Sequence, residues 1–194
     1  MEKIVLASNN EHKIKEFKEI LKNFEIITMK EVGFYDDIVE DGTTFEENSE
    51  IKADAILKFL KSKNLNYMVM ADDSGLCVNA LNGAPGVYSA RYANAHNDQA
   101  NRNKLLENLK NAKDRSAYFM CVITLKKPDG TKIVGKGKVD GVILEKETGN
   151  TSFGYDCLFY SNELKKCFGL CTDKEKNSVS HRGRAIQDLL SKLN

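Results

Sequence analysis

The chain has 194 residues, which is enough for one folded domain with a sizeable core. Apolar residues make up 41% of the chain, a share typical of a packed globular protein and not of a disordered one. Lysine and arginine total 29 against 28 for aspartate and glutamate, so the overall charge gives no reason to expect a nucleic-acid or membrane partner. We therefore expect a single domain over residues 1–194, in which any phosphate chemistry depends on local clusters of charge.

The cysteines and the N-terminal segment favour a soluble, cytoplasmic protein. The five cysteines are odd in number and no two have the CxxC spacing, so we expect reduced, partly buried thiols and no zinc site. The apolar run that follows Lys3 is too short for a signal peptide. No stretch of the sequence approaches the roughly 20 apolar residues of a membrane span.

The first part of the chain predicts a strand, a polar turn and a helix. Residues 3–7 form a short apolar run typical of a strand, and residues 11–22 have apolar side chains at helical spacing. Residues 25–28 predict a second strand, followed by an acidic, irregular connection. A capping box from Thr44 to Glu47 then predicts the start of a second helix.

The middle and end of the chain mix strands with helices. Residues 67–71 are a near-continuous apolar run, which predicts a buried central strand that ends abruptly at Asp72. The elements expected after it are a helix over 97–111, a hairpin of strands over 117–125 and 132–139, a further strand around 142–144, and a final helix over 180–193. This order predicts an α/β fold in which a mixed central sheet has flanking helices and two lobes enclose a cleft.

The turn between the first strand and the first helix is a candidate phosphate site. Free backbone N–H groups at a helix start attract anions, and Ser8 and Asn10 add polar side chains there. Lys13, about one turn into the helix, supplies a positive charge. The same pattern fits an ordinary helix cap followed by a solvated lysine, so both interpretations stay open.

The second predicted helix carries a second candidate. Phe45, Asn48 and Lys52 lie at i, i+3 and i+7 and therefore share one helix face. A lysine on the face of a core phenylalanine suggests an ammonium group that points into a cleft, while a side chain that reaches out to water is the alternative. Glu40 lies upstream in the connection and cannot be placed by periodicity.

Asp72 and Asp73 form the third candidate, directly after the apolar strand. Adjacent carboxylates at the end of a buried strand are costly unless they are solvated, paired or bound to a metal. Oxygen ligands of this type suit Mg²⁺, and the carboxyl ends of strands are where open α/β sheets bind ligands. An aspartate-rich turn is the alternative interpretation.

Polar blocks recur in the second half, at Phe153-Gly154-Tyr155-Asp156 and at Lys176 with Ser180-His181-Arg182. The macrodipole disfavours cations at the start of a helix, so the second block predicts an anionic or acceptor-rich ligand. Six blocks then follow one another along the chain: Ala7-Ser8-Asn9-Asn10-x-x-Lys13, Thr44-Phe45-x-Glu47-Asn48-x-x-x-Lys52-Ala53, Ala71-Asp72-Asp73-Ser74-Gly75-Leu76, Gly83-Ala84-Pro85-Gly86-Val87-Tyr88-Ser89-Ala90-Arg91, Phe153-Gly154-Tyr155-Asp156, and Glu175-Lys176-Asn177-x-x-Ser180-His181-Arg182.

With these blocks the sequence resembles, nearly end to end, the inosine-triphosphate pyrophosphatase family, also called the Ham1 or non-canonical purine NTP pyrophosphatase family. It departs from that family at Cys157, where proline is usual, and at Asn9, which replaces a frequent glycine. The resemblance implies a Mg²⁺-dependent homodimer that hydrolyses ITP, dITP and XTP to the monophosphate and pyrophosphate, and cleaves them much faster than ATP or GTP.

The resemblance also implies residue roles. Asp73 is the expected catalytic residue, with Asp72 as support, and Glu40 and Asp73 are the expected metal ligands. The residues expected to bind the triphosphate end of the substrate are Ser8, Asn9, Asn10, Glu11, His12, Lys13, Lys52 and Ser74. Those expected to bind the base end are Phe153, Gly154, Tyr155, Asp156, Lys176, His181 and Arg182. A Maf-like nucleotide pyrophosphatase and a non-catalytic nucleotide-binding module are the alternatives.

Overall fold

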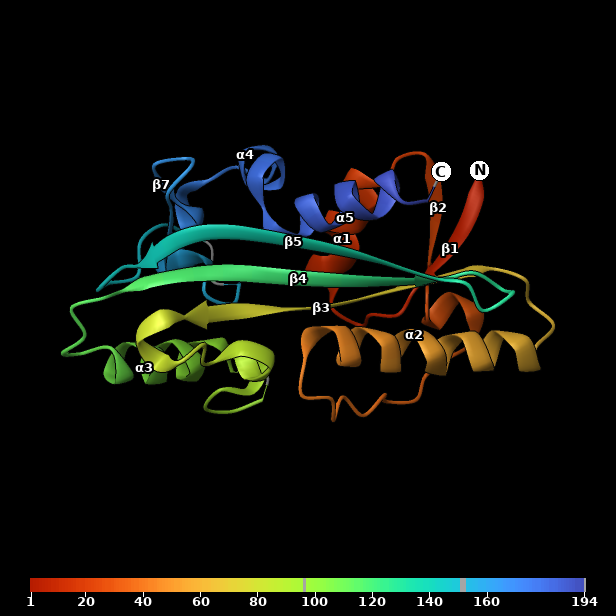
Figure 1. Cartoon of the computed structure of the whole chain (residues 1–194), viewed down its shortest axis with the longest axis horizontal. Coiled ribbons are helices and arrows are strands. Elements are labelled where there is room, and N and C mark those ends of the chain that lie inside the picture. Colours follow the sequence, from red (N-terminus) through yellow and green to blue (C-terminus); the bar gives the residue numbers. More distant parts are fainter. Residues whose placement is uncertain (96, 151–152, 194) are drawn as a thin grey trace. The chain divides into compact units, whose positions relative to one another are not determined.

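A computed structural model describes residues 1–95, 97–150 and 153–193 of the chain, and Figure 1 shows its helices and strands. In chain order these elements are β1 (Glu2–Leu6), α1 (Glu11–Ile20), β2 (Phe24–Thr28), α2 (Phe45–Ser62), β3 (Met68–Val78), α3 (Asp98–Asn108), β4 (Ser116–Lys126), β5 (Lys132–Ile143), β6 (Phe159–Ser161), β7 (Lys166–Cys167), α4 (Asp173–Val179) and α5 (His181–Ser191). Short 3₁₀ helices lie at Lys30–Val32, Asn79–Leu81, Gly86–Arg91, Asp156–Leu158 and Phe168–Leu170.

The strands form one mixed sheet in the order β2-β1-β3-β4-β5-β6-β7. β1 pairs in parallel with β2 and with β3, whereas β6 pairs antiparallel with β5 and with β7. The predicted α/β class with a mixed sheet and flanking helices is therefore confirmed. The chain divides into two compact units, and the predictions of one functional domain and of a cleft between two lobes stay predictions.

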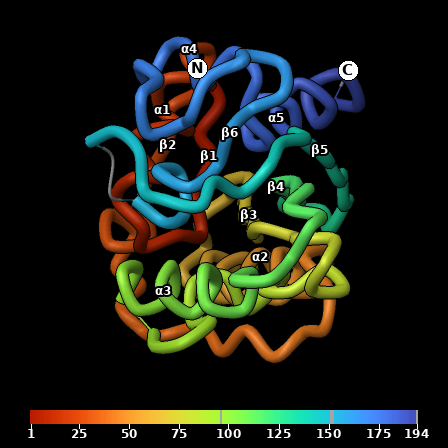
Figure 2. Tube along the Cα trace, turned by 90° about the vertical axis from the view of Figure 1, so that its left-hand side faces the viewer, coloured from red at the N-terminus to blue at the C-terminus, as the bar shows by residue number. Residues whose placement is uncertain are grey.

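The first unit contains Met1–Asp73, Val122–Lys136 and the residues from Ala185 onward. Within it, α2 covers one face of the sheet and α1 covers the other, as Figures 1 and 2 both show. Successive side chains of a strand point to opposite faces, so Val69 and Ala71 of β3 pack with the apolar residues of α2, among them Ile56 and Leu60. The same alternation sends Asp73 to the α2 face and Asp72 to the α1 face.

The second unit contains Ser74–Cys121 and Gly137–Arg184. Its core joins the end of β3 with aliphatic residues of α3 and a group of aromatic rings. Phe119 packs against Phe159 with ring centroids 4.7 Å apart, and Leu105 of α3 and Leu109, which caps the C-terminal end of that helix, are fully buried. This core supports the segments on which the base-end candidates lie.

Several predicted elements change in the structure. The strand predicted over 67–71 does not end at Asp72, because β3 continues through the acidic pair to Val78. The strand predicted around 142–144 is largely the end of β5. Helix α4 was not expected; a capping box between Thr172 and Glu175 opens it, so Lys176 lies on a helix separate from α5.

The remaining general predictions concern the cysteines and the membrane. All five cysteines are free, and four of them are buried, as expected for reduced thiols. Within residues 1–95, 97–150 and 153–193, no helix is both long enough and apolar enough to cross a bilayer.

Candidate active site

The turn before α1 is built by local hydrogen bonds. The Asn10 side-chain oxygen accepts from the backbone N–H of Lys13 at 3.1 Å, which caps the helix, and Ser8 Oγ accepts from the N–H of Asn10 at 3.2 Å. Asn9, Asn10, Glu11 and His12 are exposed, and Ser8 is half-buried. The cap interpretation of Asn10 is therefore confirmed, while the role of this turn in phosphate binding stays a prediction.

Lys13 is more than a solvated lysine. Its ammonium group lies 2.9 Å from Asp72 Oδ2, and the Asp72 side chain is fully buried. This ion pair provides the charge compensation that a carboxylate in the middle of a buried strand requires. It explains how β3 continues through Asp72, and it rules out an aspartate-rich turn at this position.

The α2 face predicted from periodicity points into the protein. Asn48 Nδ2 donates to Asp73 Oδ2 at 3.0 Å, and Lys52 Nζ donates to Glu40 Oε2 at 2.6 Å. Lys52 is only 8% exposed, so its side chain does not reach out to bulk water. The same Asn48 also accepts from the backbone N–H of Gly42 at 2.9 Å, which ties the connection that carries Glu40 to α2.

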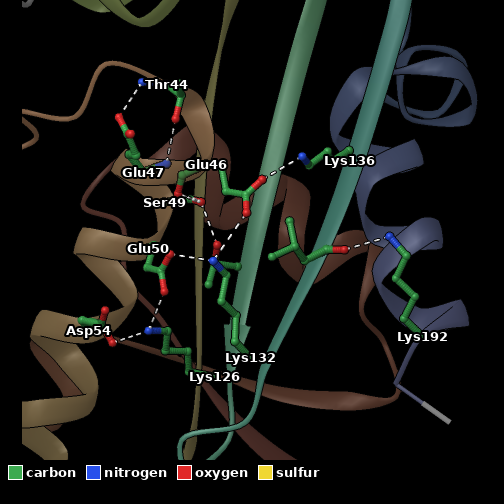
Figure 3. Close-up of polar contacts among 12 residues, drawn as sticks. Thr44, Glu46, Glu47, Ser49, Glu50, Asp54, Lys126, Lys132, Lys136 and Lys192 are labelled. Atoms are coloured by element: carbon green, nitrogen blue, oxygen red, sulfur yellow. Dashed lines mark hydrogen bonds and ion pairs between the residues drawn. The ribbon is translucent and has the colours of Figure 1, made fainter.

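A ladder of ion pairs holds α2 against the hairpin of β4 and β5, as Figure 3 shows. Its acidic members are on α2 and its basic members are on the two strands; they are Glu46, Glu50, Asp54, Lys126, Lys132 and Lys136. A hydrogen bond joins the same helix to β4: the hydroxyl oxygens of Ser49 and Thr124 lie 2.8 Å apart, and both residues are fully buried. These contacts fix the position of the helix that presents Asn48 and Lys52.

Asp73 has an unusual electrostatic environment. Burial raises its pKa above the ordinary aspartate value, because the carboxylate loses its hydration. The charges of Lys52 and Lys13 and the hydrogen bond from Asn48 lower the pKa, while the charge of Glu40 raises it further. Two carboxylates and two ammonium groups therefore interact around one buried strand position.

The donor set around Asp73 fits a hard cation. In the described residues, no cluster of three or more His, Cys, Asp and Glu side chains is arranged to hold a metal. Mg²⁺ needs fewer protein ligands, since it usually takes one or two carboxylates and completes its shell with water and phosphate oxygens. Glu40 and Asp73 are a set of that kind. After burial, the negative charge of Glu40 is the second factor that raises the pKa of Asp73.

The base-end candidates of the second unit form two groups. In the first group, Lys176 Nζ donates to Asp156 Oδ2 at 2.7 Å and lies 5.7 Å from the centre of the Phe153 ring. Asp156 is 4% exposed, so this is a buried ion pair with an aromatic ring beside it. The neighbouring Tyr155 donates its hydroxyl to the carbonyl of Ser89 at 2.8 Å.

The second group lies at the start of α5. Arg182 Nη2 donates to Ser74 Oγ at 3.1 Å, and Ser74 directly follows Asp73 in β3. The His181 ring stacks on Phe119 with centroids 4.9 Å apart and planes 15° apart. Both candidates are buried, and the helix macrodipole at this end disfavours the positive charge of Arg182.

A pocket of about 680 Å³ lies beside α1 in the first unit. Ser8, Asn9 and Glu11 line it together with Lys15, Lys18, Lys22 and Lys30. The acidic pair of β3 does not belong to its lining. The candidate role of Asp73 therefore depends on its own hydrogen bond and neighbouring charges and not on this pocket.

Three residues that bind the predicted site residues were missing from the predicted set. Asn48 holds Asp73, and its position on the same helix face as Lys52 was a usable signal. Asp98 and Arg102 of α3 bind the backbone of Gly154, and no local pattern in the sequence indicates this contact.

Comparison with known proteins gives a consistent result over the whole chain. The family model described as Ham1 family matches residues 4–192. A dITP/XTP pyrophosphatase of Clostridium perfringens is 56% identical over 199 residues, which cover 100% of this chain and 98% of the relative. A dITP/XTP pyrophosphatase of Leuconostoc mesenteroides is 46% identical over 197 residues, which cover 98% of this chain and 96% of the relative.

Solved structures are similar over the same extent. The Ham1 protein of Staphylococcus aureus has a TM-score of 0.86 and 44% identity, with 99% of this chain and 98% of that chain covered. A Ham1 protein of Coxiella burnetii has a TM-score of 0.86 and 38% identity, with 100% and 98% covered.

Proposed function

The chain belongs to the Ham1 family, and from this premise we propose that it hydrolyses the non-canonical purine nucleotides ITP, dITP and XTP to the monophosphate and pyrophosphate. The observation that carries the proposal is the buried pair Asp72 and Asp73, which interacts with Lys13 and Lys52. Carboxylates repel phosphate unless cations intervene, so this mixture of charges suits a polyphosphate substrate. The relatives named dITP/XTP pyrophosphatase support the choice of purine.

In the proposed reaction, a water molecule attacks a phosphorus atom of the triphosphate, the bond between the α-phosphate and the β-phosphate breaks, and the products are the monophosphate and pyrophosphate. Ionised Asp73 orients this water and accepts its proton. Lys13 and Lys52 bind the phosphate oxygens together with the polar groups of the turn at Ser8 and Asn10. Most of the rate gain would come from positioning and charge stabilisation, as in other phosphoryl transfers.

We further propose that the cofactor is Mg²⁺ and that Glu40 and Asp73 hold it. When bound, a divalent cation neutralises part of the phosphate charge. The raised pKa of Asp73 supports this assignment, because a buried carboxylate with incomplete charge compensation binds a cation readily.

Base selection is assigned to the second unit. Phe153 would stack on the purine, with Tyr155 as part of the same segment, while Asp156 and Lys176 supply hydrogen-bonding groups. Hypoxanthine and xanthine present an O6 acceptor where adenine presents an N6 donor. Donors at His181 and Arg182 would bind the former and be left unpaired by the latter, which is a large penalty in a buried site.

The protein is proposed to act as a cytoplasmic homodimer without a nucleic-acid or membrane partner. The near balance of 29 basic and 28 acidic residues supports the absence of a polyanionic partner. Light scattering coupled to size-exclusion chromatography measures the oligomeric state, and a monomeric mass would overturn the homodimer.

The reaction is tested by identifying its products. Incubation with ITP and Mg²⁺ should give IMP and pyrophosphate in equal amounts, and a chelator should stop the reaction until Mg²⁺ is restored. IDP and orthophosphate as products, or nucleotide binding without turnover, would contradict the proposal.

A further inference from the structure

One helix binds both polar groups of Gly154. The Gly154 N–H donates to Asp98 Oδ2 at 2.7 Å, and the Gly154 carbonyl accepts from Arg102 Nη1 at 2.9 Å. Asp98 and Arg102 are four residues apart in α3 and therefore lie on the same helix face. Both hydrogen bonds have a charged partner, which makes them stronger than ordinary backbone pairs.

Arg102 is itself held in place. Its Nε donates to Glu147 Oε1 at 2.9 Å, and its Nη2 donates to Gln99 Oε1 at 2.9 Å. The residue is 3% exposed, which is unusual for an arginine whose only role is solubility. The guanidinium group thus has a fixed position from which it binds the Gly154 carbonyl.

Gly154 lies between Phe153 and Tyr155, so its position determines where the segment directs its side chains. Its φ of +55° belongs to the left-handed region that glycine adopts without strain. The next residues are fixed by other contacts, Tyr155 through its hydroxyl on Ser89 and Asp156 through Lys176. The α3 contacts hold both polar groups of the peptide at Gly154, the residue that directly follows Phe153.

We propose that Asp98 and Arg102 are positioning residues for base recognition, which hold the Gly154 peptide so that Phe153 and Asp156 meet the purine correctly. Neither residue is assigned a contact with the substrate. The inference rests on the proposed function, in which this segment binds the base. It predicts that loss of the α3 contacts impairs base selection more than phosphate chemistry.

The test compares Arg102→Met with Arg115→Met. Arg115 also donates through all three nitrogens of its side chain, to the carbonyls of Ile143, Leu109 and Leu144, but it makes no such bond to Gly154. Methionine keeps the unbranched length and removes the donors from both sites. Arg115→Met therefore controls for loss of stability, and both variants are assayed well below their measured Tm.

Arg102→Met should raise KM for ITP and lower the ratio of kcat/KM for ITP to that for ATP by about 10- to 100-fold, the loss expected from a displacement of about 1 Å. The inhibition constant of inorganic triphosphate, which has no base, should stay within about threefold. Asp98→Asn keeps an acceptor for the Gly154 N–H and should retain most of the ITP preference, while Asp98→Ala should lose it. Arg115→Met should leave the ratio unchanged.

A second measurement is independent of turnover. The chain contains no tryptophan, so Phe153→Trp introduces a single fluorescent reporter into the segment. Adding Arg102→Met to this variant should increase quenching of the indole by acrylamide, whereas adding Arg115→Met should not.

These outcomes separate the two proposals. If the wild type does not prefer ITP, the proposed function fails, while increased quenching specific to Arg102→Met would still support the positioning role. If Arg102→Met and Arg115→Met give the same ITP-to-ATP ratio and the same quenching, the positioning role is overturned even though the proposed function stands.

Discussion

Replacement of Asp73 by asparagine should stop turnover while leaving the protein at least as stable. Asp73 is 7% exposed, and burial raises its pKa above the ordinary value of 3.8. A raised pKa in the folded state means that folding favours the protonated form. The contribution of this group to stability is therefore fully present below about pH 4 and is lost as the pH rises through the folded-state pKa.

At neutral pH and without divalent cations, the amide of Asp73→Asn removes the cost of a desolvated charge and can still accept the hydrogen bond from Asn48. Lys13 and Lys52 keep Asp72 and Glu40 as partners. We expect the free energy of unfolding to rise or to stay within about 1 kcal/mol. Turnover should fall by at least about 10³-fold, because both the group proposed to activate water and a proposed metal ligand are lost.

Asp72→Asn is the matched control. It breaks the ion pair between Asp72 and Lys13. Because the Lys13 side chain is 16% exposed, the free energy of unfolding should fall by about 2 kcal/mol, less than the roughly 3–5 kcal/mol lost when a fully buried pair is broken. For a chain of this length that lowers Tm by about 4–8 °C. Thermal unfolding at pH 7 and at pH 4, with pyrophosphate release from ITP, measures both effects. A fall in Tm for Asp73→Asn as large as that for Asp72→Asn, or turnover above about a tenth of the wild type, would refute the reasoning.

Three further predictions concern other parts of the molecule. Lys52→Met should lower kcat/KM for ITP by about 10- to 100-fold, because a charge-assisted hydrogen bond contributes about 1.5–3 kcal/mol. The control variant Lys126→Met should leave kcat/KM near the wild-type value. Thr124→Val removes the buried hydroxyl partner of Ser49 and should lower the free energy of unfolding by about 1–3 kcal/mol in urea titrations, with kcat unchanged. Burial raises the pKa of Cys157 to about 11, so this thiol should react slowly with iodoacetamide. Mass spectrometry should find it unalkylated in the folded protein at about pH 7.5 and alkylated after unfolding. Rapid labelling of the folded protein would contradict this prediction.

The local features of the fold could be predicted from the sequence because their causes are local. The capping box at Thr44 and the cap at Asn10 each depend on residues three positions apart, and both are present in the structure. The strand pairings within the sheet depend on contacts between distant segments, so only the class of sheet could be expected.

The continuation of β3 shows where sequence reasoning fails. An acidic pair after an apolar run indicates a strand end, because an unpaired carboxylate in a sheet is costly. Lys13, which pairs with Asp72, and Asn48, which donates to Asp73, offset part of that cost, and both partners are distant in sequence. The same limit applied to Glu40, which periodicity could not place and which the structure pairs with Lys52.

The sequence indicated the candidate site residues but not all of the residues that hold them in place. The predicted residues Lys52, Asp156, Lys176 and Arg182 all have polar partners within the predicted set. The supporting residues Asp98 and Arg102 act on a backbone more than fifty positions away, and a periodic pattern in one helix carries no information about such a contact.

The central claim is tested most directly by the specificity of the reaction. Pyrophosphate release would be measured at several concentrations of ITP, dITP, XTP, ATP and GTP with Mg²⁺ to obtain kcat/KM for each. We expect kcat/KM for the first three to exceed that for ATP by at least about 100-fold, the discrimination that a buried site achieves when its donors would be left unpaired, and to exceed that for GTP as well. Values for ATP within a few-fold of those for ITP would contradict the account.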